Sequence, residues 1–366
     1  MAGALSGYRV LEFGDHPAVA VLGMLLADQG ADVVKVESPD GDPLRGTPVF
    51  SVWNRGKKSV VAANDDCELM SSLVAGADAV VEGSHSGQSP YGIDGDSARD
   101  MRSDIVRLSL PGFGEGHPHA GTPGTELLIS AATGVYTDRS KDASEGVSFL
   151  ALPYASIFAA MVAAPALAAA LYHRERTGEG QAVTVPLYDA MFTAMGSAVV
   201  SRPDVEPGPR ATSPAIARFY RCGDGRWINL NAMYERSLRP VLDVLGHPEW
   251  FGPLTDSRLY DNLEEIEEWA ARLQEPWLAR PALEWESLMA EAGVPLTMCR
   301  TLREWMETDH AIASGAVLDV EDHEFGPMRQ VGIQVRLSGT PGGVGIPAPR
   351  LGQHNETILA EAKREK

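Results

Sequence analysis

The stretch that decides the fold is residues 8–37, YRVLEFGDHPAVAVLGMLLADQGADVVKVE. Its segments 8–13 and 32–37 are short, apolar and bounded by turn residues, a pattern typical of buried strands. Residues 17–29 between them predict a helix that ends at Gly30. A strand, a helix and a strand in this order predict a βαβ unit with a right-handed crossover. The sequence therefore predicts a parallel sheet.

The same alternation continues beyond this unit. Further strands are predicted at 79–82, 105–110 and 182–185, and helices at 126–134 and 188–200. Residues 201–215 are rich in Pro and Arg and predict a linker.

Beyond the linker, FYRCGDGRWINLNA predicts a β-hairpin that turns at 223–225, and the pattern at 234–308 is mainly helical. A Pro- and Gly-rich stretch then leads to a short C-terminal helix. We expect an α/β class with four parts: a large α/β domain at 1–200, a linker at 201–215, a small α+β domain at 216–320, and a return to the large domain at 321–366.

An apolar segment at 149–172 is about long enough to span a bilayer. It consists mostly of alanine, which inserts weakly, and it contains Pro153 and Pro165. A buried central helix of a soluble protein explains it better, with a kink expected at Pro165.

The chain has 366 residues and a formal net charge of −19. Such a charge disfavours nucleic acid and anionic membranes as partners, and an anionic ligand would need cations placed locally. Its cysteines, Cys67, Cys222 and Cys299, lie far apart, so we expect neither disulfides nor a zinc site. No secretory signal precedes the first strand, and a cytoplasmic location is expected.

Several common catalytic patterns are missing. The first strand is not followed by GxGxxG, and no Walker A, HExxH or GxSxG pattern occurs. His117 and His119 lie in a Pro/Gly-rich loop without a neighbouring carboxylate partner, so we predict no metal site.

Five parts of the sequence, spread over about residues 5 to 360, resemble the family III CoA-transferases (CaiB/BaiF-like). This family includes carnitine, bile-acid and formyl-CoA transferases and 2-methylacyl-CoA racemase. The segments are RVLEFG with MLLADQGADVVKVESPDGDPLRG, NRGKKSVV, ALYHRERTGEGQAVTVPLYDAM, YRCGDGRWINL, and GVPLTMCRTLREWMETDH with PAPRLGQHNETIL. The resemblance implies a Rossmann-like large domain, a small domain, an interlocked dimer, and coenzyme A or acyl-CoA as substrate with no bound cofactor.

The resemblance fails at the residue that carries the covalent chemistry. Family transferases attack the thioester with an aspartate, which forms an anhydride and then an enzyme–CoA thioester. The corresponding residue here is Ser156, and no Asp or Glu lies between Glu145 and Glu175. A hydroxyl cannot form that anhydride. The plain alternative is that Ser156 caps the start of a helix.

The racemase branch also loses its catalytic pair. Its Gly-His-Asp motif corresponds here to Gly124-Thr125-Glu126, and threonine is no general base near neutral pH. Glu126 keeps a carboxylate and could act as a single base, or it could serve local structure at a helix N-terminus.

The resemblance places the CoA site in the first βα loop and in the segment after residue 82, where arginines and an Ala-Gly-Pro are often found. Neutral residues replace them here, so CoA affinity should be weakened. The candidate CoA-binding residues are His16, Pro17, Ala18, Lys35, Arg55, Lys57, Gly83, His85 and Tyr91.

These departures lead to three hypotheses. The first is a non-nucleophilic subunit of a heteromeric CoA-transferase, paired with a relative that has the aspartate. The second is an enzyme with altered acyl-CoA chemistry, such as a racemase, epimerase, isomerase or hydrolase, using Glu126 or Ser156. The third is a non-enzymatic scaffold or ligand sensor. A homodimer and a heterodimer both remain possible at this point.

Overall fold

The computed structural model describes residues 3–63, 66–83, 98, 100–136, 149–196, 204 and 214–364. The chain divides into two compact units. The first comprises Met1–Pro203 and Asp309–Lys366, and the second comprises Asp204–Thr308.

The first unit is built on a six-stranded parallel sheet with the order β3-β2-β1-β4-β5-β6. The strands are β1 (Arg9–Phe13), β2 (Asp32–Glu37), β3 (Lys58–Val61), β4 (Ala79–Glu82), β5 (Val106–Ser109) and β6 (Ala182–Thr184). The predicted α/β class with a parallel sheet is confirmed. Strand β3 was not predicted, because its short KSVV run follows a polar segment.

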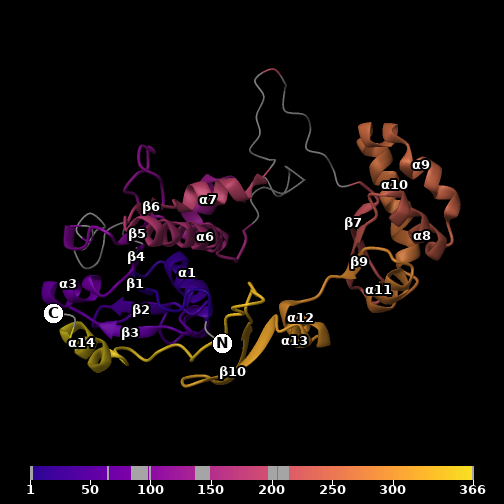
Figure 1. The fold of residues 1–366 in the computed structure, drawn as a ribbon. Helices are drawn as coiled ribbons and strands as arrows, with labels where there is room; N and C mark the ends of the chain where they lie inside the picture. The colour runs from indigo at the N-terminus through magenta and orange to yellow at the C-terminus, as the bar shows by residue number, and fades with distance from the viewer. Residues whose placement is uncertain are drawn as a thin grey trace. The chain divides into compact units, whose positions relative to one another are not determined.

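Helices cover both faces of this sheet (Figure 1). One face packs against α1 (Pro17–Asp28), α6 (Tyr154–Thr177) and α7 (Leu187–Ala194) through an apolar core. The other face packs against α3 (Cys67–Ala75) and α14 (Asn355–Arg364). The unit also contains the short helices α2 (Pro48–Trp53) and α5 (Glu126–Ala132).

Helix α6 is the alanine-rich segment that was long enough for a membrane span. Its length and hydropathy pass that test, and it lies against α1, α5, α7 and β5. It is thus packed within the first unit, but only 44% of its most apolar window is buried, less than the buried central helix that the sequence predicted. The helix continues through Pro165 and ends at Gly178, whose φ of 74° is the left-handed conformation that glycine adopts most easily.

The second unit contains a three-stranded sheet with the order β7-β8-β9. The predicted hairpin is confirmed, since β7 (Ala217–Arg221) pairs antiparallel with β8 (Trp227–Asn231), and β9 (Leu296–Met298) adds to β8. The helices are α8 (Glu235–Leu245), α9 (Phe251–Thr255), α10 (Leu263–Trp277), α11 (Ala282–Glu291) and α12 (Leu302–Met306), with 3-10 turns at Pro248–Trp250 and Ser257–Asp261.

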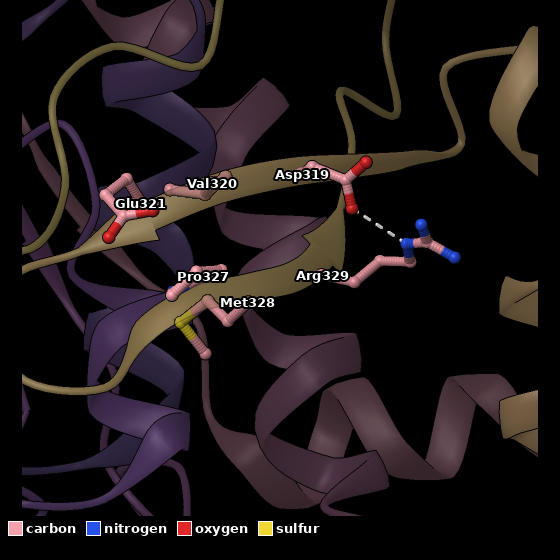
Figure 2. A pocket seen from close by; sticks show the side chains of 6 residues that line it. All are labelled: Asp319, Val320, Glu321, Pro327, Met328 and Arg329. Carbon is pink, nitrogen blue, oxygen red and sulfur yellow. Dashed lines mark hydrogen bonds and ion pairs between the residues drawn. The ribbon is translucent and has the colours of Figure 1, made fainter.

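The chain returns to the first unit at Asp309, earlier than the residue 321 expected from sequence. A boundary at 321 would divide β10 (Val317–Asp322), which forms a hairpin with β11 (Gly326–Val331) after the short α13 (Asp309–Ala313). Residues of both strands of this hairpin line a surface hollow of about 450 Å³. Asp319 and Arg329 form an ion pair there, with a distance of 2.8 Å, and Figure 2 shows the side chains that line the hollow.

Candidate functional site

The strand order marks where a ligand would be expected. In an open parallel sheet, ligands bind beyond the carboxyl ends of the strands, at the point where the strand order reverses. Here that point lies between β1 and β4. Gly14 follows β1 and Gly83 follows β4, and they approach so closely that a Cβ on Gly14 would overlap the Gly83 carbonyl. Four candidate CoA-binding residues from the sequence, His16, Pro17, Ala18 and Gly83, lie at this point.

His16 connects this loop to the segment before α5. Its side chain is 2% exposed, and its Nδ1 accepts a hydrogen bond from the Ala18 N–H at 3.2 Å. Because Nδ1 is an acceptor, Nε2 carries the proton of the neutral ring and donates to the Gly124 carbonyl oxygen at 2.9 Å. His16 thereby also caps α1, whose first residue is Pro17.

The loop between β5 and α5 closes at Gly112 and Gly124. A Cβ on either glycine would overlap the backbone of the other, so only glycines permit this approach. Thr125 then caps α5, with its Oγ1 accepting from the Leu128 N–H at 3.4 Å. The side chain of Glu126, the first residue of α5, turns toward the start of α6.

Glu126 and Ser156 meet at the start of α6. The Glu126 carboxylate accepts four hydrogen bonds, from Ser130 Oγ at 3.1 Å, Ala155 N at 2.9 Å, Ser156 N at 2.9 Å and Ser156 Oγ at 2.8 Å. These backbone N–H groups lie in the first turn of α6, where the helix itself offers no acceptor. Glu126 therefore caps a helix that begins 28 residues after it.

The two side chains differ in accessibility. Ser156 is 0% exposed, whereas Glu126 is partly exposed. The plain alternative, a small residue at the start of a helix, agrees with the buried place of Ser156 in the first turn of α6; the N-cap residue is Pro153, however, and Ser156 donates its hydroxyl proton to Glu126. A molecule that approaches from solvent meets the carboxylate before the hydroxyl.

Lys35 and Lys57 belong to a buried ionic cluster. Lys35 Nζ lies 3.1 Å from Glu12 Oε1 and 2.8 Å from Asp42 Oδ2, and Lys57 Nζ lies 2.7 Å from Glu12 Oε2. Burial disfavours the charge on Lys35, but Glu12, Asp42 and Glu37 outweigh it and raise its pKa. Burial lowers the pKa of Lys57 to about 8.

Arg55 is buried in a comparable arrangement. Its guanidinium forms a bidentate pair with Asp28, at 3.2 and 2.6 Å, and donates to the carbonyl oxygens of Val331 and Gly332. In this conformation neither this cation nor the two lysines presents a charge to solvent. Direct phosphate contact would require these buried pairs to break, so the structure argues against the predicted phosphate role of Lys35, Arg55 and Lys57.

Two predicted CoA-binding residues, His85 and Tyr91, lie outside the described residues. Among the residues that are described, no group of three or more His, Cys, Asp or Glu side chains could hold a metal ion.

Glu12 and Gly23 were not predicted from the sequence. A charged residue inside the apolar strand YRVLEF does, however, indicate that Glu12 has a buried partner of opposite charge.

The fold and this site define an α/β protein with an open parallel sheet and a smaller second unit. The chain belongs to CoA-transferase family III, whose family model matches residues 5–355. It is 28% identical to succinyl-CoA–D-citramalate CoA-transferase of Chloroflexus aurantiacus, over 98% of this chain and 93% of the relative.

Two further similarities are informative. The chain is 24% identical to the succinyl-CoA–L-malate CoA-transferase alpha subunit of the same organism, over 98% of this chain and 88% of the relative. The crystal structure of a hypothetical protein (Rv3272) from Mycobacterium tuberculosis matches with a TM-score of 0.83 and 26% identity, covering 98% of this chain and 99% of that chain.

Proposed function

We propose that this protein is the non-nucleophilic subunit of a heteromeric family III CoA-transferase, paired with a related chain that has an aspartate at the position of Ser156. The observation that carries this proposal is the start of α6. The hydroxyl there is fully buried, and the neighbouring carboxylate is held by four hydrogen bonds.

The chemistry of transfer explains why this matters. A carboxylate that attacks an acyl-CoA expels the CoA thiolate and forms a mixed anhydride. The thiolate then attacks the side-chain acyl carbon and releases the donor acid, which leaves an enzyme–CoA thioester. Ser156 can form only an ester, which does not offer CoA a side-chain acyl group. For Glu126 to attack the thioester, its carboxylate would have to break hydrogen bonds that stabilise its negative charge.

Exposed apolar side chains support the need for a partner chain. On α5 and α6, Leu127 is 55% exposed and Met161 is 58% exposed, and Phe192 on α7 is also exposed. A groove of about 710 Å³ between α1 and α6 is lined mainly by apolar side chains. Large apolar surfaces of this kind are typical of protein interfaces. One relative is itself named as an alpha subunit.

The proposal is tested by comparing the CoA-transferase activity of the lone chain with that of the chain co-expressed and purified with an aspartate-bearing family III chain. With succinyl-CoA as donor and a dicarboxylate as acceptor, the lone chain should transfer no CoA and show no CoA adduct by intact-protein mass spectrometry. The co-expressed pair should be active and should lose activity when the partner's aspartate is changed to asparagine. Transfer by the lone chain, or a CoA thioester trapped on it, would contradict the proposal.

A second candidate is an acyl-CoA enzyme in which Glu126 acts as a general base. The favouring observation is that its carboxylate is partly exposed, whereas Ser156 lies beneath it. We expect the lone chain, if it follows this route, to incorporate deuterium from solvent at the α-carbon of an acyl-CoA. Glu126→Gln should abolish the exchange, and Glu264→Gln, on the exposed first turn of α10, should not. Exchange that survives Glu126→Gln excludes Glu126 as the base.

A scaffold or ligand-sensor role and a cytoplasmic location stay predictions. Calorimetric titration with free CoA addresses the scaffold, because a scaffold without a CoA site produces no binding heat, whereas a CoA-binding subunit or sensor does.

A further inference from the structure

The β3 edge of the parallel sheet is covered by a segment from the C-terminal part of the chain. Strand β3 is the last strand on this side of the sheet, so its outward backbone groups need partners from elsewhere. The Ser59 N–H donates to His354 Nδ1 at 3.1 Å, and the His354 N–H donates to the Ser59 carbonyl oxygen at 3.0 Å. Beside them, the Val61 N–H donates to Asn355 Oδ1 at 2.9 Å. Residues 350–355, which we call the edge clasp, thus take the place of a further strand.

The edge clasp also fastens the C-terminal helix. Helix α14 begins at Asn355, directly after the clasp, and contacts α3 and β3 (Figure 1). Its Ile358 is 1% exposed and belongs to the apolar core on that face of the sheet. Its Glu361 pairs with Arg9 of β1 at 2.7 Å, and both of these side chains are partly exposed. Beyond the clasp, α14 is therefore held by little more than one fully buried side chain and one partly exposed ion pair.

The ring of His354 can complete the clasp only when it is neutral. Its Nδ1 accepts the Ser59 N–H, so the proton of the neutral ring lies on Nε2. A protonated ring would turn an N–H toward the Ser59 N–H, and two donors cannot share a hydrogen bond. Burial and the charge of Lys58 lower the pKa of His354, and the carboxylate of Asp32 opposes them. Asp32 is itself paired with Lys58 and Arg9.

The other carboxylate near the clasp is also engaged. Glu37 on β2 accepts the hydroxyl proton of Ser59 at 2.6 Å and forms an ion pair with Arg45. Within the part of the chain that the structure describes, His354 forms no ion pair. Protonation of His354 would therefore break a hydrogen bond without a carboxylate in place to compensate for the loss.

We propose that the edge clasp is an acid-released switch, in which protonation of His354 frees residues 350–364 from β3 and uncovers the edge of the sheet. Because the folded state favours the neutral ring, the stabilisation is fully present above the ordinary His pKa of about 6.5 and is lost as the pH falls through the lower pKa of the folded state. An uncovered edge strand presents N–H and C=O groups that can pair with other chains. Acid release is independent of the proposed function, since it involves neither CoA nor a partner chain.

Hydrogen–deuterium exchange of the full-length protein tests this switch, with each rate divided by the rate of the unfolded chain at the same pH. Between pH 7.5 and pH 5, where histidine changes its charge, the protection of peptides that contain residues 58–61 and 350–364 should fall by about tenfold or more. The protection of β1, at the centre of the sheet, should change by less than about threefold, because only the edge opens.

Variants of His354 separate its protonation from a general effect of acid. His354→Gln keeps a side-chain oxygen that can accept the Ser59 N–H but does not titrate, so clasp protection should no longer depend on pH. His354→Ala removes the acceptor and should lower protection at both pH values. His247→Gln, in the second unit, is the matched control and should leave the acid effect unchanged.

Three results would overturn the proposal. One is equal protection of the wild-type clasp at both pH values. Another is an acid effect that persists in His354→Gln, because a different group would then be responsible. The third is full protection of the clasp in His354→Ala at pH 7.5, because the ring would then not be what holds the segment.

Discussion

Replacing Glu12 with glutamine should destabilise the protein by about 3 kcal/mol, because Glu12 is the carboxylate shared by two fully buried lysines. Lys35 keeps its pair with Asp42, but Lys57 loses its ion-pair partner. Since burial already lowers the pKa of Lys57 to about 8, the lysine can release its proton, and this release limits the penalty. Chemical denaturation followed by circular dichroism measures the free energy of unfolding.

The matched control is Asp319→Asn. Asp319 pairs with Arg329 across the β10–β11 hairpin (Figure 2). The side chain of Asp319 is, however, 74% exposed. Exposed ion pairs contribute at most about 1 kcal/mol. If Glu12→Gln costs no more than Asp319→Asn, the buried cluster is not what stabilises the sheet, and Lys35 and Lys57 return as candidates for phosphate binding.

Gly23→Ala should destabilise the protein by about 3 kcal/mol, although glycine to alanine normally stabilises a helix. Gly23 lies in α1 directly above the ion pair of Glu12 and Lys57. An alanine Cβ there would overlap Glu12 Oε2 and lie 2.8 Å from Lys57 Nζ. The helix or the pair must shift, and a shift of the pair exposes charges that the fold keeps buried.

Gly252→Ala provides the comparison for this change. Gly252 also lies in a helix, α9, and a Cβ there would meet no atom within 4 Å outside its own helix backbone and its two chain neighbours. Because Pro253 follows and disfavours a Cβ on a helical residue before it, the gain in helix propensity is offset, and the change should stay within about 1 kcal/mol of neutral. Equal effects of the two changes would show that the space above the Glu12–Lys57 pair is larger than the structure indicates.

The contacts of these buried charges bear on acyl-CoA binding by the first βα unit. The cations that sequence comparison favoured for phosphate contact hold the sheet to α1 and to the segment at Val331 and Gly332. At the strand-order reversal, in contrast, lie the buried His16 ring and the backbone of Gly83, whose N–H donates to the Phe13 carbonyl oxygen.

Periodicity in the sequence located most elements of the fold. Strands β1, β2 and β4 and helices α1 and α6 lie close to their predicted positions, since long apolar patterns with clear stop residues are local features. Strand β3 and the β10–β11 hairpin were missed. The KSVV run of β3 follows a polar segment, which hides it, whereas the alternation of charged and apolar residues in VLDVED is itself a strand signal.

The sequence by itself determined the parallel sheet, the family resemblance and the lack of a carboxylate between Glu145 and Glu175. Only the tertiary structure decided that Glu126 supplies a carboxylate to the start of α6 from 30 residues away, and that Lys35, Arg55 and Lys57 are buried in ion pairs. The physical reason is the separation along the chain over which each kind of signal acts. Periodicity and stop residues act within one element, whereas the partner of a buried charge is chosen by the packing of segments that are distant along the chain.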